Sequence, residues 1–146
     1  MMITDRVLLD ALAQWMHAQG IAVYDPDGIY DDNMTLPAVV FGAMPDAPHN
    51  AVTLNVYDTS IARDDTGNPD YWVQFRFRAD GNDPRTVGDM ADLLAAHLLD
   101  HTHVALTPQV EVRHAHRTVR TPVGMDTNRR YERADSYRLS LKPLTT

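Results

Sequence analysis

The chain has 146 residues and a mass of 16.4 kDa, so we expect one domain that spans residues 1–146. Hydrophobic residues make up 44% of the chain and charged residues 23%, which is ordinary for a globular domain and excludes an intrinsically disordered polymer. No apolar run approaches the roughly 20 residues of a bilayer span, and no export leader is recognisable, so we expect no membrane contact. The sequence contains no cysteine, which excludes disulfides, thiolate metal sites and cysteine nucleophiles.

Charge is distributed unevenly along the chain. Residues 1–70 contain eleven aspartates and two arginines, whereas residues 71–146 contain nine acidic and eleven basic residues. This asymmetry follows either from where the polar loops fall or from faces that complement one another between neighbouring copies. The net charge is −7 and no run of Lys or Arg is present, so the chain is a poor candidate for a general nucleic-acid-binding protein.

The first 33 residues predict a helix, a short strand and a polar loop. Thr4 is a suitable N-cap, and Leu8, Leu12 and Trp15 recur at helical spacing, so we expect an amphipathic helix that ends at Gly20 and buries these three side chains. Residues 21–24 are predicted as a short strand. Residues 25–33 are rich in Asp, Pro and Gly, which indicates turns.

The next segments predict most of a sheet. Residues 37–43 are expected to form a buried strand and residues 51–57 an alternating strand, with a proline-rich turn between them. Residues 58–70 lack periodicity and are predicted to form a long acidic loop. In residues 71–79, Val73, Phe75 and Phe77 alternate with Gln74, Arg76 and Arg78, so one face of this strand belongs to the core and the other is polar and cationic.

The remaining segments complete an α+β fold. Asp83 and Pro84 supply the start of a second amphipathic helix that runs to about residue 100. Residues 109–117 and 131–142 are predicted as strands, joined by a long loop over residues 118–130. We therefore expect a largely antiparallel β-sheet packed against two amphipathic α-helices.

The sequence offers little catalytic chemistry. His101 and His103, and likewise His114 and His116, place two imidazoles on one side of an extended segment, which could chelate zinc or could simply lie on a sheet face. The usual hydrolase, phosphate-binding and dinucleotide-binding motifs are missing. We therefore expect no enzyme activity, no cofactor and no metal. A metal-dependent hydrolase and a small-molecule-binding module remain the alternatives outside the structural proteins.

Charged side chains on the predicted strands suggest a contact surface. Guanidinium groups gathered on a sheet face need counter-charges, which either the acidic segments of the same chain or those of a neighbouring copy could supply. The second case describes a head-to-tail contact, which closes into a ring when the rotation permits. The candidate subunit-interface residues are Asp58, Arg63, Asp64, Asp65, Arg76, Arg78, Arg113, Arg117, Arg129 and Arg130.

Three segments carry a resemblance to a known family. Met44 to Leu54 is a proline-bracketed turn followed by a strand, and residues 71–78 read Tyr-Trp-Val-Gln-Phe-Arg-Phe-Arg ahead of an amphipathic helix. Gly124 and Asp126, followed by the run from Arg129 to Glu132, precede the last strand. In this order and spacing the chain resembles the minor capsid and tail terminator proteins of long-tailed bacteriophages.

The resemblance implies a subunit of a ring, typically a homo-hexamer, at the head-proximal end of the tail tube. Such a ring stops tube polymerisation and joins the tail to the head–tail connector. It also implies a place in the tail or neck of the virion, after assembly in the host cytoplasm. The implied partners are copies of the chain itself, the tail tube protein and the connector or stopper protein, with DNA only as passing cargo. The main alternative is a head–tail stopper or another neck ring protein.

Overall fold

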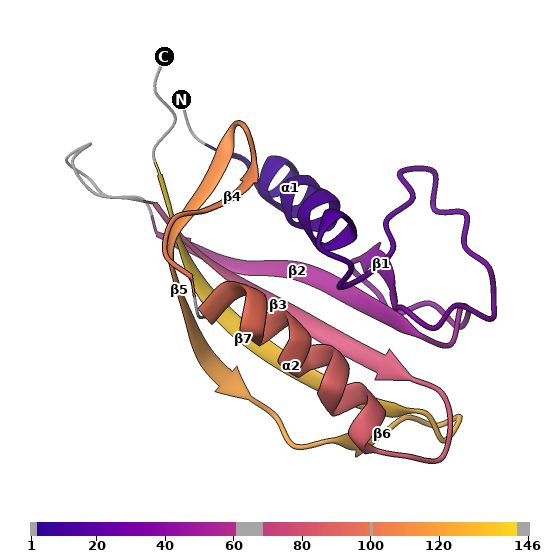
Figure 1. Cartoon of the computed structure of the whole chain (residues 1–146). Coiled ribbons are helices and arrows are strands. Elements are labelled where there is room, and N and C mark those ends of the chain that lie inside the picture. The colour runs from indigo at the N-terminus through magenta and orange to yellow at the C-terminus, as the bar shows by residue number, and fades with distance from the viewer. Residues whose placement is uncertain (1–2, 61–68, 100, 143–146) are drawn as a thin grey trace.

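The computed structural model describes residues 3–60, 69–99 and 101–142, which form two helices and seven strands (Figure 1). Six strands follow one another across the sheet in the order β1-β2-β3-β7-β5-β4, and β6 pairs with β7. Among the described strands, only β1 and β2 pair in parallel. The elements are α1 (Asp5–Ala18), β1 (Ala38–Phe41), β2 (Ala51–Ser60), β3 (Asp70–Ala79), α2 (Arg85–Leu99), β4 (Val104–Thr107), β5 (Val110–Arg120), β6 (Gly124–Met125) and β7 (Tyr131–Leu141).

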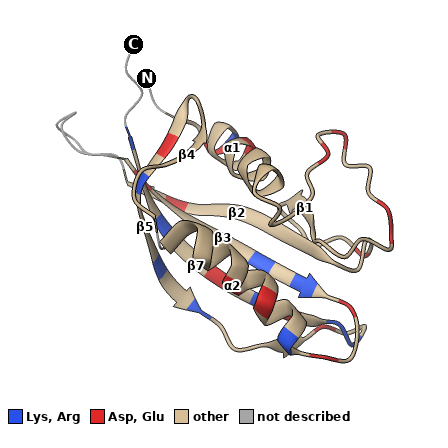
Figure 2. Ribbon diagram, in the orientation of Figure 1, with Lys and Arg blue, Asp and Glu red and all other residues tan. Residues whose placement is uncertain are grey.

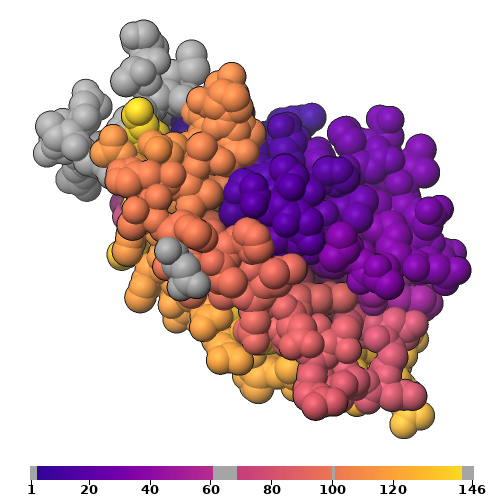
Figure 3. Space-filling model, in the orientation of Figure 1, coloured from indigo at the N-terminus to yellow at the C-terminus, as the bar shows by residue number. Residues whose placement is uncertain are grey.

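Both helices lie on the same face of the sheet (Figure 1). In the space-filling view, α1 and α2 together cover much of that face (Figure 3). The predicted α+β fold, a largely antiparallel sheet packed against two amphipathic helices, is confirmed. Neither helix is long and apolar enough to cross a membrane within the described residues.

The helices begin and end where the sequence predicts. The Thr4 hydroxyl accepts a hydrogen bond from the Val7 backbone N–H at 3.2 Å, and Gly20 follows α1 with a φ of +72°, a left-handed conformation that glycine adopts without strain. The Asp83 carboxylate accepts from the Arg85 backbone N–H at 2.9 Å at the start of α2. The inward faces are fully buried, as the apolar spacing requires: Leu8, Leu12, Trp15 and Met16 from α1, and Val87, Ala91, Leu94 and Leu98 from α2.

The alternation along β3 also sets its packing. Val73, Phe75 and Phe77 are buried beneath the helices, and the Phe75 ring meets the Tyr137 ring of β7 edge-to-face at 5.6 Å. The side chains between them lie on the opposite face, which neither helix covers. Along β3, the face under the helices is therefore apolar and the opposite face is polar.

Two predictions about the first half of the chain are wrong. Residues 21–24 form no strand, only a single bridge between Val23 and Ala38. The reason is that the backbone N–H groups of Ile21 and Ala22 donate to the Met16 carbonyl at the end of α1, so they cannot join a ladder. The strand predicted over residues 37–43 is the shorter β1, which ends before Gly42, a residue with a φ of +84°.

The predicted loops are shorter than expected. β2 continues to Ser60 and β3 begins at Asp70, so both ends of the predicted loop over residues 58–70 are strand, and residues 61–68 lie outside the described residues. β5 continues to Arg120, and β6 occupies part of the predicted loop over residues 118–130. β4, a four-residue edge strand, was not predicted.

Candidate subunit contact surface

The arginines singled out from the sequence lie in two different environments. Figure 2 shows basic positions on β3 and β5 and acidic positions along the loop that precedes β1. Among the described candidates, some side chains are buried and bonded within the chain, and others are exposed at the sheet edges. Arg63, Asp64 and Asp65 lie outside the described residues.

Arg78 is buried, with 2% of its surface exposed, although it alternates with core residues on β3. Its guanidinium donates to the backbone carbonyls of Pro45, Pro48 and His49 at 2.6, 2.7 and 2.9 Å. Burial, and then the nearby Arg130 charge, lower the pKa of Arg78. Arg78 therefore holds the proline-rich turn against the end of β3, and the expectation that it lies on a free face is wrong.

Arg130 binds the same turn from the other side. It donates from Nη1 to the Asp46 carbonyl at 2.6 Å and from Nε to the Asp126 carboxylate at 2.8 Å. Burial acts to raise the pKa of Asp126, but hydrogen bonds from the Arg130 and Asn128 backbone N–H groups and from the Arg130 guanidinium outweigh burial and lower it. We call Arg78, Arg130, Asp126 and residues 45–49 the arginine clamp. In the clamp, both guanidinium groups use their donors within the chain, and Arg130 is also paired with the Asp126 carboxylate.

A second buried network lies beneath α2, and the sequence reasoning missed it. Arg133 and Asp135 on β7 form a bidentate ion pair, with nitrogen–oxygen distances of 3.0 and 2.9 Å, and Arg133 also reaches Asp92 of α2 at 3.1 Å. Arg117 lies 3.6 Å from the Asp135 carboxylate, and its Nη1 has no hydrogen-bond acceptor among the described residues. The signal in the sequence is the two-residue spacing of Arg133 and Asp135, which places both on one face of a strand.

The exposed candidates lie elsewhere. Arg76 is half-exposed on the uncovered face, 3.7 Å from Glu132, an ion pair that is worth little in water. Arg129 is exposed beside the clamp with a φ of +64°. Asp58 and Arg113 are exposed at opposite edges of the sheet. These residues remain available to a neighbouring molecule.

Neither histidine pair belongs to a metal site in the described part of the chain. His101, His103, His114 and His116 are all exposed. His103 lies 4.0 Å from Glu111, and no group of three potential metal ligands comes together among the described residues.

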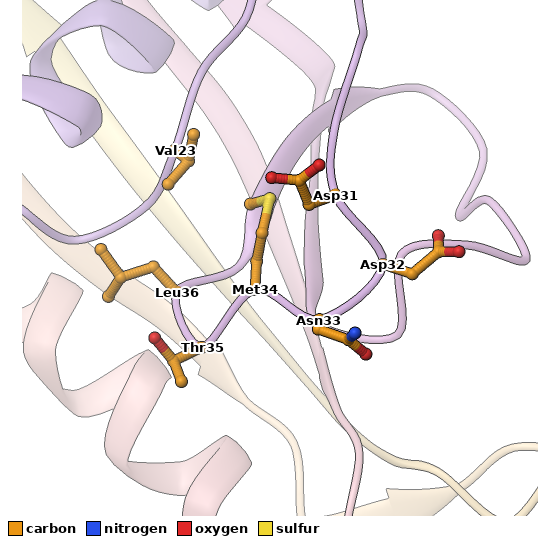
Figure 4. A pocket seen from close by; sticks show the side chains of 7 residues that line it. All are labelled: Val23, Asp31, Asp32, Asn33, Met34, Thr35 and Leu36. Atoms are coloured by element: carbon orange, nitrogen blue, oxygen red, sulfur yellow. The ribbon is translucent and has the colours of Figure 1, made fainter.

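Two open hollows lie in the described surface near α1 and the loop that precedes β1. The first, of about 690 Å³, is open and is lined by Val23 and the loop over residues 31–36. Figure 4 shows its side chains spread along the loop and not aimed at one point. The second, of about 670 Å³, lies between α1 and the end of β1, where the Tyr24 hydroxyl donates to Asp10. Burial, and then this hydrogen bond to Asp10, raise the pKa of Tyr24 to about 12, so its hydroxyl stays protonated.

Comparison with known proteins fits this picture of a subunit without a catalytic cluster in its described residues. A family model described as bacteriophage tail terminator protein matches residues 15–143, a range that contains the whole sheet, α2 and the end of α1. The chain is thus a phage structural protein. It belongs to the bacteriophage tail terminator family, as the resemblance in the sequence predicts.

A solved structure supports the same architecture. A chain of the structure titled "Virion of native gene transfer agent (GTA) particle" superimposes with a TM-score of 0.56. The two chains are 17% identical, and the match covers 90% of this chain and 86% of that chain. At this identity the likeness concerns the fold. No match was found among the curated proteins.

Proposed function

We propose that the protein forms a ring that caps the head-proximal end of the phage tail tube, stops its polymerisation and joins it to the head–tail connector. The observation that carries this proposal is the family match over the entire sheet and α2. The match covers the whole sheet and not one motif, which supports a terminator role for the fold as a whole. The proposed partners are other copies of the chain, the tail tube protein and the connector or stopper protein.

The proposed mechanism is capping by shape, with no bond made or broken. One side of the ring presents enough of the contact surface of a tube subunit to bind the last tube ring, and the opposite side differs, so that no further tube subunit adds.

The exposed charged residues are the proposed contacts between copies. Asp58, Arg76, Arg113 and Arg129 are free to meet a neighbour, and Arg117 is half-buried at the edge of the sheet. Arg63, Asp64 and Asp65 stay in the proposal on sequence grounds alone. Arg78 and Arg130 are left out, because the arginine clamp uses their donors within the chain. In a head-to-tail ring, every copy uses both its acidic and its basic edge.

The charge of the chain suits a conduit for DNA. Six copies would carry six times the net charge of −7, and negative charge facing the channel repels the phosphate backbone. DNA would then pass without adhering, which is what a tail requires. The proposal therefore includes DNA as cargo and not as a bound partner.

Electron microscopy of tails assembled without this protein tests the proposal. Overlong tubes are the expected result, because nothing would stop their growth. Tubes of normal length beside unjoined heads would instead identify a head–tail stopper. Co-purification gives the second readout, since a terminator binds the tail tube protein, whereas a stopper binds the adapter protein on the portal.

A further inference from the structure

Each edge of the sheet has a stretch of strand without an outer neighbour among the described residues. β1 pairs with β2 only over Ala51 to Leu54, so residues 55–60 of β2 have a free edge. β4 pairs with β5 only up to Val112, so residues 113–120 have a free edge as well. Free edges expose backbone donors and acceptors that readily pair with another strand.

The two free stretches lie at the same level of the sheet. Asp58 of β2 pairs with Trp72, Trp72 pairs with Arg138, and Arg138 pairs with His116 of β5. Asp58 and His116 therefore occupy one row, on the face that the helices do not cover. The successive pairings across β3 and β7 likewise place Thr59 level with Ala115 and Ser60 level with His114.

The strand directions are also compatible. β2, β3, β7 and β5 are successive antiparallel neighbours, so β2 and β5 run in opposite directions. A rotation about an axis along the strands preserves these directions. In a ring of that symmetry, β5 of one copy meets β2 of the next copy as an antiparallel pair without any shift along the axis.

The chemistry of the two stretches is complementary. Residues 113–120 contain three arginines and two histidines and no acid, whereas residues 55–60 contain Asp58 and no base. In the aligned register, Asp58 faces His116 on the face that the helices do not cover. Cross-strand pairs of opposite charge stabilise a sheet, and like charges oppose its formation.

Short strands at the ends of the free stretches limit the register. β1 covers β2 up to Leu54, and β4 covers β5 up to Val112, which lies beyond the level of Ser60. If β5 of one copy shifted along β2 of the next copy in one direction, it would collide with β1. If it shifted in the other direction, the β4 strand attached to it would collide with the next copy. Residues 58–60 and 114–116 contain no register irregularity, so both stretches are regular strand where the proposed pairing between copies requires it.

We propose that β5 of one copy adds to β2 of the next, with His116 facing Asp58, so that a single β-sheet continues around the ring. This inference rests on the proposed ring and names the surface that builds it. It gives the otherwise unused pair His114 and His116 a place in the contact between copies.

Cysteine cross-linking tests the pairing, because the natural chain has no cysteine. The test variant carries Asp58→Cys and His116→Cys. Facing residues of an antiparallel pair have Cα atoms about 4.5–5.5 Å apart, which suits a disulfide. Within one chain the two positions are separated by three strand spacings, about 14 Å, which is too far for a disulfide. Oxidation should therefore give a ladder of covalent multiples of 16.4 kDa on non-reducing gels.

The matched control carries Asp58→Cys and Ala115→Cys, which places the second thiol on the opposite face of β5. It should give no ladder. The native mass of the unmodified protein, measured alone and with tail tubes, is recorded alongside. A ring whose test variant gives no ladder, or whose control cross-links equally well, overturns the edge pairing and leaves the proposed function standing. A protein that stays monomeric even with tubes overturns both.

Discussion

Arg78 and Arg113 are both arginines on β-strands, yet the fold uses them in opposite ways. Arg78 is enclosed by the proline-rich turn and donates to three backbone carbonyls, whereas Arg113 is exposed on the stretch of β5 that β4 does not cover. Strand alternation determines the face on which a side chain lies. Whether another segment covers that face depends on the tertiary fold. Arg78 and its clamp serve the stability of the subunit, and the free edge of β5 serves contacts with other molecules.

The strongest test of this comparison is charge reversal at Arg78. Arg78→Glu removes three buried hydrogen bonds and places a carboxylate against the same carbonyls, so we expect a loss of about 4 kcal/mol or more in the free energy of unfolding. Arg76→Glu is the matched control on the uncovered face of β3 and should cost less than about 1 kcal/mol. Urea denaturation followed by circular dichroism measures both. Equal losses in the two variants would contradict the contrast between clamped and free arginines.

The buried network under α2 provides the next test. Removing one partner with Asp135→Leu leaves Arg133 charged and buried, so we expect a loss of about 3 kcal/mol in the free energy of unfolding. Adding Arg133→Met to the same chain should restore most of that stability, because an apolar pair needs no counter-charge. A double-mutant cycle in urea quantifies the coupling. Additive losses would show that the two side chains do not act as a pair.

The elements predicted from the sequence are those whose signals are local. The spacing of Leu8, Leu12 and Trp15 and the cap at Thr4 depend only on neighbours within a turn or two, so α1 was predicted correctly. The extension of β2 to Ser60 was not predicted, because Asp58, Thr59 and Ser60 show no apolar alternation of their own and are held as strand by pairing with residues 70–72 of β3. β4 and β6 are too short for their periodicity to be recognised.

The site was predicted less well than the fold for the same reason. The carbonyls that enclose Arg78 belong to residues 45–49, about thirty positions earlier, and no local pattern indicates which arginine they will bind. One signal was present. The proline-bracketed turn comes just before β2, and the first residue of β2, Ala51, pairs with Arg78 of β3, so the turn lies close to Arg78. Asp58 was selected from the sequence as part of a loop, and the structure places it on a strand edge.

The free edge of β5 is tested by a charge swap between Asp58 and His116, the two residues proposed to face each other between copies. Asp58→Lys places like charges across the proposed contact, so we expect the dissociation constant between copies to rise about tenfold, equivalent to about 1.4 kcal/mol. Adding His116→Asp should restore assembly, because each interface then pairs a lysine with a carboxylate. Sedimentation velocity measures the assembly. Stability of the monomer should change by less than about 0.5 kcal/mol, because both positions are exposed.

The smallest expected effect is on the acid stability of the arginine clamp. The pKa of Asp126 lies below its ordinary value in the folded chain, so its contribution to stability is present above the ordinary aspartate pKa of about 3.9 and is lost as the pH falls through the folded value. Asp126→Asn keeps an oxygen acceptor but cannot ionise. The variant should therefore be less stable than the natural chain at neutral pH, and the difference should shrink as the pH is lowered below 4. Thermal midpoints measured across this range test the sign, and a difference that widens toward acid pH would contradict the assignment of Asp126 as the charged partner of Arg130.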